Sequence, residues 1–131
     1  MVIRVQNRRR LSKAERMVVY RKYDGHCAYC GTEIKPEEMQ VDHVVPLGGW
    51  REKGEDTVDN MFPACRSCNC YKARSTIEGF RKMLENMPFV LMRDSTTYKN
   101  AVRFGLVTPT PKKVVFYFEM NNLEAEGCSN Q

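Results

Sequence analysis

Residues 27–31 read Cys-Ala-Tyr-Cys-Gly, and residues 65–69 read Cys-Arg-Ser-Cys-Asn. Each stretch holds two cysteines separated by two residues, which is typical of a zinc knuckle, a tight turn whose backbone amides point at thiolate sulfur. Two knuckles that meet around one ion supply four thiolates, the closed tetrahedral set that zinc favours. The sequence therefore predicts a structural zinc ion bound by Cys27, Cys30, Cys65 and Cys68.

A disulfide framework is one alternative for a chain with six cysteines, and an iron or redox site is another. Four of the six lie in the two close pairs, and the Arg-rich amino terminus is not followed by the apolar block of an export signal. Metal binding is therefore favoured over disulfides. Cys70 and Cys128 have no paired spacing and are interpreted as free thiols.

The chain has 131 residues, enough for one domain with one modest core. We expect a flexible basic arm at residues 1–11, a single domain at 12–119 and a disordered tail at 120–131. The net charge of +5 is unevenly distributed, because residues 36–60 hold 2 basic and 7 acidic side chains while both flanks are basic. Acidic groups in basic surroundings suit a site that holds a cation beside phosphate, although an ordinary solvated surface is an equally simple interpretation.

Local signals predict the order of helices and strands. Two Ser-x-x-Glu capping boxes, Ser12 with Glu15 and Ser75 with Glu78, mark the starts of helices. The predicted elements are a helix from residue 12 that Gly25 stops, a strand over 41–47 broken by Pro46, a short helix from 65 to 72, a helix from 75 to about 85 that Pro88 ends, a helix over 95–104, and a strand over 114–118.

Between the knuckles, residues 41–49 read Val-Asp-His-Val-Val-Pro-Leu-Gly-Gly, residues 59–63 read Asp-Asn-Met-Phe-Pro, and Asn69 directly follows the second pair. With the paired cysteines around them, these residues resemble the HNH endonucleases, and in particular the small zinc-containing kind encoded by bacteriophages and prophages. The resemblance extends from about Ser12 to Phe118. It implies an α+β protein with a small ββα-metal (HNH) core and a structural four-cysteine zinc site, flanked by helices and a C-terminal strand.

The resemblance places the first His of the family motif at His43, its Asn at Asn60 and its last His at Asn69. The asparagine at the third position is a variation within the family that replaces an imidazole nitrogen with an amide oxygen. Phosphodiester hydrolysis needs a deprotonated water, and a neutral imidazole near pH 7 can take its proton. His43 is therefore the predicted general base, in preference to a merely hydrogen-bonded structural histidine. Asn60 is predicted to orient the loop or the backbone around His43.

One catalytic divalent ion is expected at Asp42 and Asn69, where it would neutralise the charge that grows on the 3′ leaving oxygen. Carboxylate and amide oxygens suit Mg²⁺ or Mn²⁺ better than softer ions, so weaker activity is expected with zinc in this site. Neighbouring strand residues point to opposite faces, yet Asp42 and His43 must both reach one phosphate. We therefore expect the strand to bend, helped by Pro46 and the two glycines.

Several side chains are candidates for DNA contacts. Lys72 lies three residues after Asn69, so the two share a helix face and Lys72 could touch a phosphate, although a solvated lysine is an equally simple interpretation. Trp50 could stack on bases or act as a wedge. The arginines of the amino-terminal arm could bind DNA by charge. They are Arg8, Arg9 and Arg10.

Taken together, these features predict a metal-dependent DNA endonuclease that nicks or cuts both strands. The alternative is a zinc module that binds nucleic acid or a partner protein without cutting, which would not need a base beside a carboxylate suited to metal. The resemblance implies a role in phage DNA packaging or maturation with the terminase large subunit as partner, and leaves homing or restriction open. The expected location is the cytoplasm, that of the bacterial host if the chain is phage-encoded, and no stretch approaches the roughly 20 apolar residues of a membrane helix.

Overall fold

The computed structural model describes residues 10–120. The predictions that concern the remaining positions, including Arg8, Arg9 and Cys128, lie outside the described residues. The named elements follow in chain order, and after them residues 117–120 are helical as well. The named elements are α1 (Lys13–Arg21), the 3-10 helix η1 (Pro36–Glu38), β1 (Gln40–His43), the 3-10 helix η2 (Val58–Asn60), β2 (Met61–Ala64), α2 (Arg66–Lys72), α3 (Ile77–Asp94) and α4 (Thr96–Arg103).

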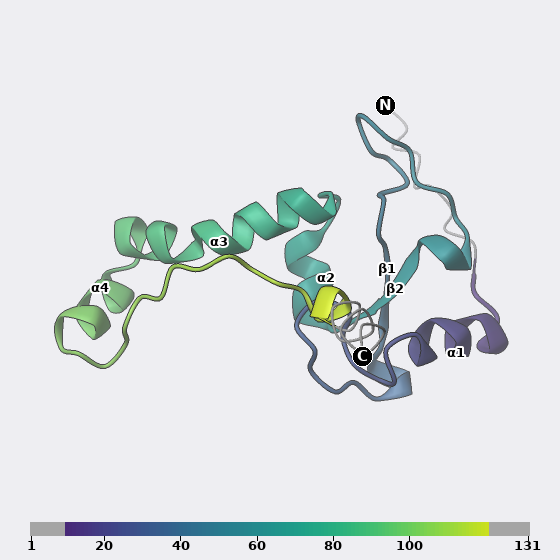
Figure 1. The fold of residues 1–131 in the computed structure, drawn as a ribbon, viewed down its shortest axis with the longest axis horizontal. Helices are drawn as coiled ribbons and strands as arrows, with labels where there is room; N and C mark the ends of the chain where they lie inside the picture. The colour runs from purple at the N-terminus through teal and green to yellow at the C-terminus, as the bar shows by residue number, and fades with distance from the viewer. Residues whose placement is uncertain (1–9, 121–131) are drawn as a thin grey trace, which may run out of the picture.

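An antiparallel hairpin and the helix that follows it form the centre of the molecule (Figure 1). Strand β1 pairs with β2 in a register that sets Asp42 opposite Phe62 and His43 opposite Met61. Helix α2 begins directly after β2 and packs against β1. The predicted ββα core is therefore confirmed, although β1 is shorter than the predicted strand because the chain bends at residues 44 and 45.

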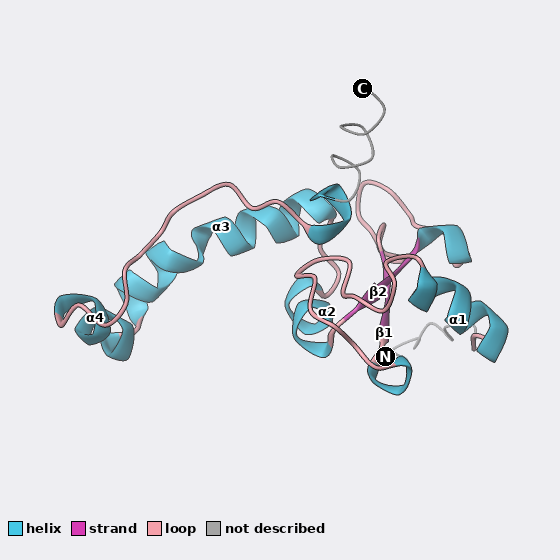
Figure 2. Cartoon of the chain, turned by 60° about the horizontal axis from the view of Figure 1, so that its bottom comes forward, coloured by secondary structure: helices cyan, strands magenta, loops and turns pink. Residues whose placement is uncertain are grey.

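The remaining helices lie on opposite sides of this core. Helix α1 packs against β2, while α3 carries α4 away from the hairpin (Figure 1). From α4 the chain returns alongside α3 to the core, as both views show (Figure 2). None of the helices within residues 10–120 is both long and apolar enough to cross a membrane.

The start of α1 follows the predicted capping box. The Ser12 hydroxyl accepts a hydrogen bond from the Glu15 amide at 3.1 Å, and the Ser12 amide donates to the Glu15 carboxylate at 3.2 Å. These two bonds satisfy backbone donors that a helix start otherwise leaves open. The helix ends before Asp24 and Gly25, which both adopt positive φ. Leu11, predicted to belong to the arm, instead packs against buried side chains.

Two apolar clusters make up the core, and Cys65 packs against both of them. One cluster is aromatic and lies between the first knuckle, α3 and the C-terminal segment. Its buried members are Cys27, Tyr29, Ala64, Phe80 and Phe116. The other is aliphatic and lies under α1. Its buried members are Val19, Ile34, Met39 and Met61.

The predicted strand over residues 114–118 is wrong, although the segment does enter the core through Phe116, which is 1% exposed. Its backbone donors go to separate partners rather than to a ladder. The Val114 amide donates to the Glu85 carboxylate, the Phe116 amide to the Glu119 carboxylate, and the Tyr117 amide to the Tyr29 carbonyl. Residues 114–116 therefore lie outside regular secondary structure, and residues 117–120 are helical.

Two predictions about α3 are also wrong. The helix starts after Thr76, whose hydroxyl accepts from the Gly79 amide at 3.0 Å, while the Ser75 hydroxyl donates to the Lys72 carbonyl and so is not the cap. The helix also continues through Pro88 to Asp94. Proline removes one backbone donor, but strong helix formers such as Met87 and Leu91 on either side of it favour continuation.

Arg81 on α3 fastens the C-terminal segment to the core, so Arg81→Ala should lower the free energy of unfolding. Its guanidinium donates to the Glu119 carboxylate at 2.7 and 2.9 Å and to the Val114 carbonyl at 2.6 Å, and it lies 4.8 Å from the centre of the Phe116 ring. These bonds raise the pKa of Arg81 and lower that of Glu119. Hydrogen bonds to charged groups contribute about 1.5 to 3 kcal/mol, and we expect a loss of this size in urea denaturation.

The control for that measurement is Lys82→Ala, which removes an exposed neighbouring cation that makes no hydrogen bond or ion pair within residues 10–120. Equal losses from the two variants would contradict the role given to Arg81.

Candidate active site and metal centre

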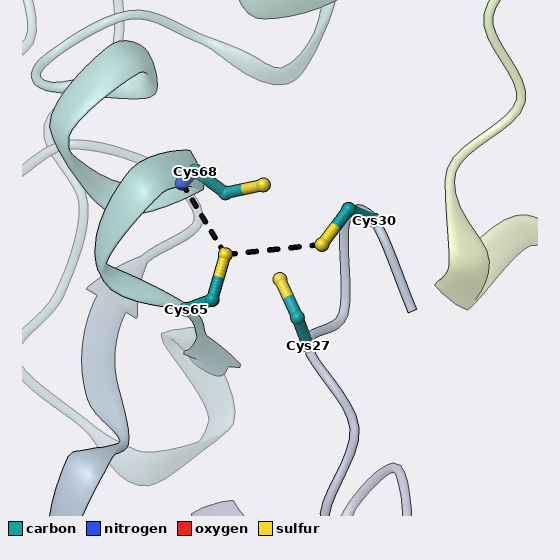
Figure 3. Close-up of side chains that lie close together, drawn as sticks. All are labelled: Cys27, Cys30, Cys65 and Cys68. Atoms are coloured by element: carbon teal, nitrogen blue, oxygen red, sulfur yellow. Dashed lines mark hydrogen bonds between the residues drawn. The ribbon is translucent and has the colours of Figure 1, made fainter. Parts of the chain in front are cut away.

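The four paired cysteines converge on one point (Figure 3). Cys27 and Cys30 come from a loop, and Cys65 and Cys68 from the start of α2, with their sulfurs directed toward one another. All four Sγ atoms lie within 4.8 Å of one another, and those of Cys30 and Cys65 are 3.8 Å apart. Zinc–sulfur bonds of about 2.3 Å in a tetrahedron place sulfurs about 3.8 Å apart, so this cluster fits zinc.

Hydrogen bonds and burial shift the pKa values of the clustered cysteines in opposite directions. A hydrogen bond from Cys68 lowers the pKa of Cys27 to about 4, with help from backbone amides, and the same shared proton raises the pKa of Cys68. Burial raises the pKa of Cys30 to about 11. The Cys68 amide also donates to the Cys65 sulfur at 3.4 Å. Amides directed at sulfur favour the thiolate form that metal binding requires.

Asp42 is the only buried carboxylate among the described residues, at 4% exposed. Its Oδ2 accepts from the Tyr29 hydroxyl at 2.5 Å and lies 3.0 Å from the Lys72 ammonium. Tyr29 remains a protonated donor because burial, and then the charge of Asp42, raise its pKa. Tyr29 stands between Cys27 and Cys30, and Lys72 ends the helix that begins at the second knuckle. Both knuckles therefore supply a partner that holds Asp42 in place.

One oxygen of Asp42 remains for a ligand. Both contacts of this carboxylate are made by Oδ2, and every buried side-chain nitrogen or oxygen within residues 10–120 has a hydrogen-bond partner. Since Oδ1 accepts no hydrogen bond there, it retains contact with solvent. Asn69 lies on α2, half-buried, and its side-chain amide makes no hydrogen bond within the described part of the chain. Carboxylate and amide oxygens of this kind fit a hard divalent cation such as Mg²⁺.

The prediction that Lys72 contacts DNA phosphate is wrong. Lys72 shares the helix face of Asn69 as expected, but that face looks onto β1 and the side chain is 0% exposed. Its ammonium donates to the His43 carbonyl at 3.2 Å in addition to its ion pair with Asp42. A buried lysine needs such partners, because an unpaired charge in the core is costly.

His43 is the last residue of β1 and is 9% exposed. Its Nε2 lies 2.9 Å from Oδ1 of Asp56, on the loop between the strands. Nδ1 makes no hydrogen bond within the described residues. Since every buried side-chain nitrogen there has a partner, Nδ1 is not buried. No hydrogen bond joins the side chains of Asp42 and His43, which bond to different partners. The predicted bend does not fall between them, because both residues pair regularly with β2 and the chain bends only at residues 44 and 45.

Asn60 braces the loop that follows His43. Its Oδ1 accepts from the Val45 amide, and its Nδ2 donates to the carbonyls of Val45 and Glu55, each at 2.9 Å. The three bonds tie both ends of the loop to the start of β2. Asn60 therefore orients the loop around His43, and its importance for catalysis stays a prediction.

Gly54 closes this loop, and Gly54→Ala should disturb it. The Gly54 amide donates to the Pro46 carbonyl at 2.9 Å, and a Cβ at residue 54 would lie 1.8 Å from the Val45 carbonyl oxygen. Overpacking typically costs about 1 to 3 kcal/mol, so we expect the midpoint of thermal unfolding to fall by roughly 4 °C or more. Gly48→Ala is the matched control, because a Cβ at residue 48 meets nothing within 4 Å. Unchanged melting of the Gly54 variant would show that the loop is not fixed at this point.

The other candidates for DNA contact lie on the surface. Trp50, at the loop between the strands, is fully exposed, and Arg10 is exposed at the start of the described chain. Within the described residues, the side-chain hydrogen bonds and ion pairs of Asp42 and His43 involve neither of them. Their role in DNA binding stays a prediction.

The hairpin, the following helix and the cysteine cluster together form a small ββα core beside a candidate metal site. Residues 27–74 match the family model described as HNH endonuclease. This part of the chain holds both knuckles, Asp42, His43, Asn60 and Asn69, and it is similar to the HNH endonuclease family.

Comparison with known proteins gives two similar proteins. The chain is 35% identical over 49 residues to the CRISPR-associated endonuclease Cas9 of Corynebacterium diphtheriae, which covers 37% of this chain and 4% of that protein. Among solved structures, the type II-C Cas9 enzyme from Actinomyces naeslundii aligns with a TM-score of 0.48 and 25% identity, over 55% of this chain and 8% of that chain. The chain thus spans a small fraction of the length of each relative.

Proposed function

We propose that this protein is a metal-dependent DNA endonuclease in which His43 activates water and Asp42 and Asn69 hold one divalent ion. The observation that carries the proposal is that, within residues 10–120, three side chains of the ββα core each keep an atom without a hydrogen bond. His43 has an unbonded ring nitrogen, Asp42 has an unbonded oxygen, and Asn69 has an unbonded amide within the described residues. The match of this region to the HNH endonucleases supports the proposal.

The proton transfer is assigned to His43. A neutral imidazole near pH 7 accepts the proton of an attacking water, and positioned general bases contribute about 10²- to 10⁴-fold to such reactions. The ring is held by a side-chain bond to Asp56, and the backbone behind it by Lys72 and Asn60. A base held on both sides keeps one orientation, which attack on a single phosphorus atom requires.

Asp42 and Asn69 are the residues that would hold the ion, which when bound supplies charge stabilisation to the phosphate and to the 3′ leaving oxygen. Asp42 keeps one oxygen for this purpose while Tyr29 and Lys72 fix the other. Oxygen donors of this kind favour Mg²⁺ or Mn²⁺ over zinc at this second site.

Cleavage of supercoiled plasmid tests the proposal. Protein purified with its structural zinc should convert the plasmid to open-circle or linear forms in Mg²⁺ or Mn²⁺, more weakly in added Zn²⁺, and not without added metal. Excess EDTA should stop the reaction. End-mapping of the products will show whether one or both strands are cut. Folded, zinc-loaded protein that binds DNA but cuts it in no metal would instead favour the alternative of a non-catalytic zinc module.

The biological setting rests on the resemblance to phage-encoded proteins. A role in DNA packaging or maturation with the terminase large subunit, in the cytoplasm of a bacterial host, stays a prediction. Co-purification with a terminase large subunit, and a change of cleavage rate in its presence, are the measurements that test it.

A further inference from the structure

Asp56 is the only carboxylate that contacts the His43 ring within the described residues, and it lies outside the motif that carries the resemblance. We propose that Asp56 is the positioning residue of the active site, which fixes the tautomer and orientation of His43 so that Nδ1 is the nitrogen that takes the water proton. This inference rests on the proposed function, because it refines the role of the proposed base.

The direction of the hydrogen bond fixes the tautomer. An ionised carboxylate can only accept hydrogen bonds, so the Nε2 atom 2.9 Å from Asp56 must carry the proton. A neutral imidazole has one N–H and one lone pair, which leaves the lone pair on Nδ1. Nδ1 is the ring nitrogen that has no partner within residues 10–120 and is not buried. The nitrogen able to act as a base is therefore the one that substrate can reach.

The loop holds Asp56 where the ring needs it. The preceding residue, Glu55, accepts a hydrogen bond through its carbonyl from Asn60, and Gly54 is bonded to Pro46. The side chain of Asp56 is 28% exposed while that of His43 is 9% exposed, so the pair lies at the edge of the core rather than free in solvent. A bond between two groups held from separate elements restrains the ring, unlike a surface ion pair between two flexible side chains.

An acid that only orients another residue has a kinetic signature. Loss of such a partner typically lowers activity by about 10- to 100-fold. Because Asp56 contacts the base and not the DNA in this assignment, Asp56→Ala should lower kcat by that factor and leave KM and the DNA dissociation constant unchanged. The control is Glu52→Ala, which removes an exposed acid from the same loop that makes no hydrogen bond or ion pair within the described chain. That variant should retain wild-type kcat.

The decisive readout is the tautomer itself, which a merely structural role would not change. The chain has only two histidines, so ¹⁵N-histidine NMR of the full-length, zinc-loaded protein can be assigned with His26→Ala. Above about pH 8, where an ordinary imidazole is neutral, wild type and Glu52→Ala should show His43 with its proton on Nε2. Asp56→Ala should shift the population toward the Nδ1–H form. If Asp56→Ala does not fold, the isosteric variant Asp56→Asn takes its place and should show the same shift.

The outcomes separate this inference from the proposed function. An unchanged tautomer in both Asp56 variants, or an equal change in Glu52→Ala, would overturn the positioning role even if the wild type cuts DNA. A wild type that cuts no DNA in any metal would overturn the nuclease proposal whatever the tautomer shows.

Discussion

Cys65→Ser should leave the protein unfolded at room temperature, whereas Cys70→Ser should fold as the wild type does. Both cysteines lie on or at the start of α2, five residues apart, and both changes replace one sulfur with oxygen. Only Cys65 belongs to the sulfur cluster, where its Sγ lies 3.8 Å from that of Cys30, while Cys70 is free and exposed. Comparison of the two variants therefore separates the effect of losing a metal ligand from the general effect of losing a cysteine.

The size of the effect follows from the small core. Structural zinc contributes on the order of 10 to 16 kcal/mol of apparent binding energy, and a whole domain of this kind is stable by about 5 to 15 kcal/mol. Cys65 also packs against both apolar clusters, so the zinc site connects the two halves of the core. Without the ion, the remaining burial cannot offset the entropy of the ordered chain.

Circular dichroism during thermal unfolding, together with zinc content per chain, checks this expectation. Wild type and Cys70→Ser should hold one zinc per chain and melt cooperatively. Cys65→Ser should hold none and show no transition, and wild type stripped by a strong chelator should behave the same way until zinc is restored. Cooperative melting of zinc-free Cys65→Ser near the wild-type midpoint would show that the cluster is dispensable.

The features that local sequence encodes are the ones that can be predicted. The spacing within each cysteine pair predicts the cluster that the structure contains, because a knuckle is a turn of a few residues. The capping box at Ser12 and Glu15 likewise depends on neighbours in the chain. The ββα core follows from the family resemblance of residues around His43 and Asn69 and is confirmed by the fold.

The errors arise where partners distant in the sequence decide the outcome. Residues 114–118 are rich in β-formers, yet their amides bond to Glu85, Glu119 and the first knuckle, which no pattern within the segment reveals. The spacing places Lys72 on the correct helix face, but it does not show that this face is covered by β1 and Asp42. Burial of a lysine depends on a partner 30 residues away, and spacing along one helix cannot supply it.

The sequence pattern also fails to identify the residues that hold the proposed catalytic side chains. In the sequence, Tyr29 is only a spacer between two cysteines, and Asp56 is one of several acids in a polar loop. The available signal is chemical: a buried carboxylate such as Asp42 requires donors, and a fixed imidazole requires a partner for its second nitrogen. The sequence shows that such partners must exist, but the fold is needed to identify them.

His43→Ala should abolish DNA cleavage while leaving the fold intact, and His26→Ala should retain both. We expect the cleavage rate of the His43 variant to fall by about 10²- to 10⁴-fold, the contribution of a positioned general base. His26 is a suitable control because its ring contacts the Tyr23 carbonyl at 3.1 Å, Glu33 at 4.0 Å and the Tyr117 ring, none of which belongs to β1. Its removal tests the loss of an imidazole without touching the strand that carries the base.

The measurement separates a missing base from a damaged site. Zinc content, melting temperature and the DNA dissociation constant of His43→Ala should stay close to wild type, because Lys72 and Asn60 hold the backbone there through main-chain atoms rather than through the ring. Added imidazole should then restore part of the lost rate, since a small base can occupy the space of the missing ring. Full activity of His43→Ala without imidazole would exclude His43 as the base. Another proton acceptor near Asp42 would then have to be sought.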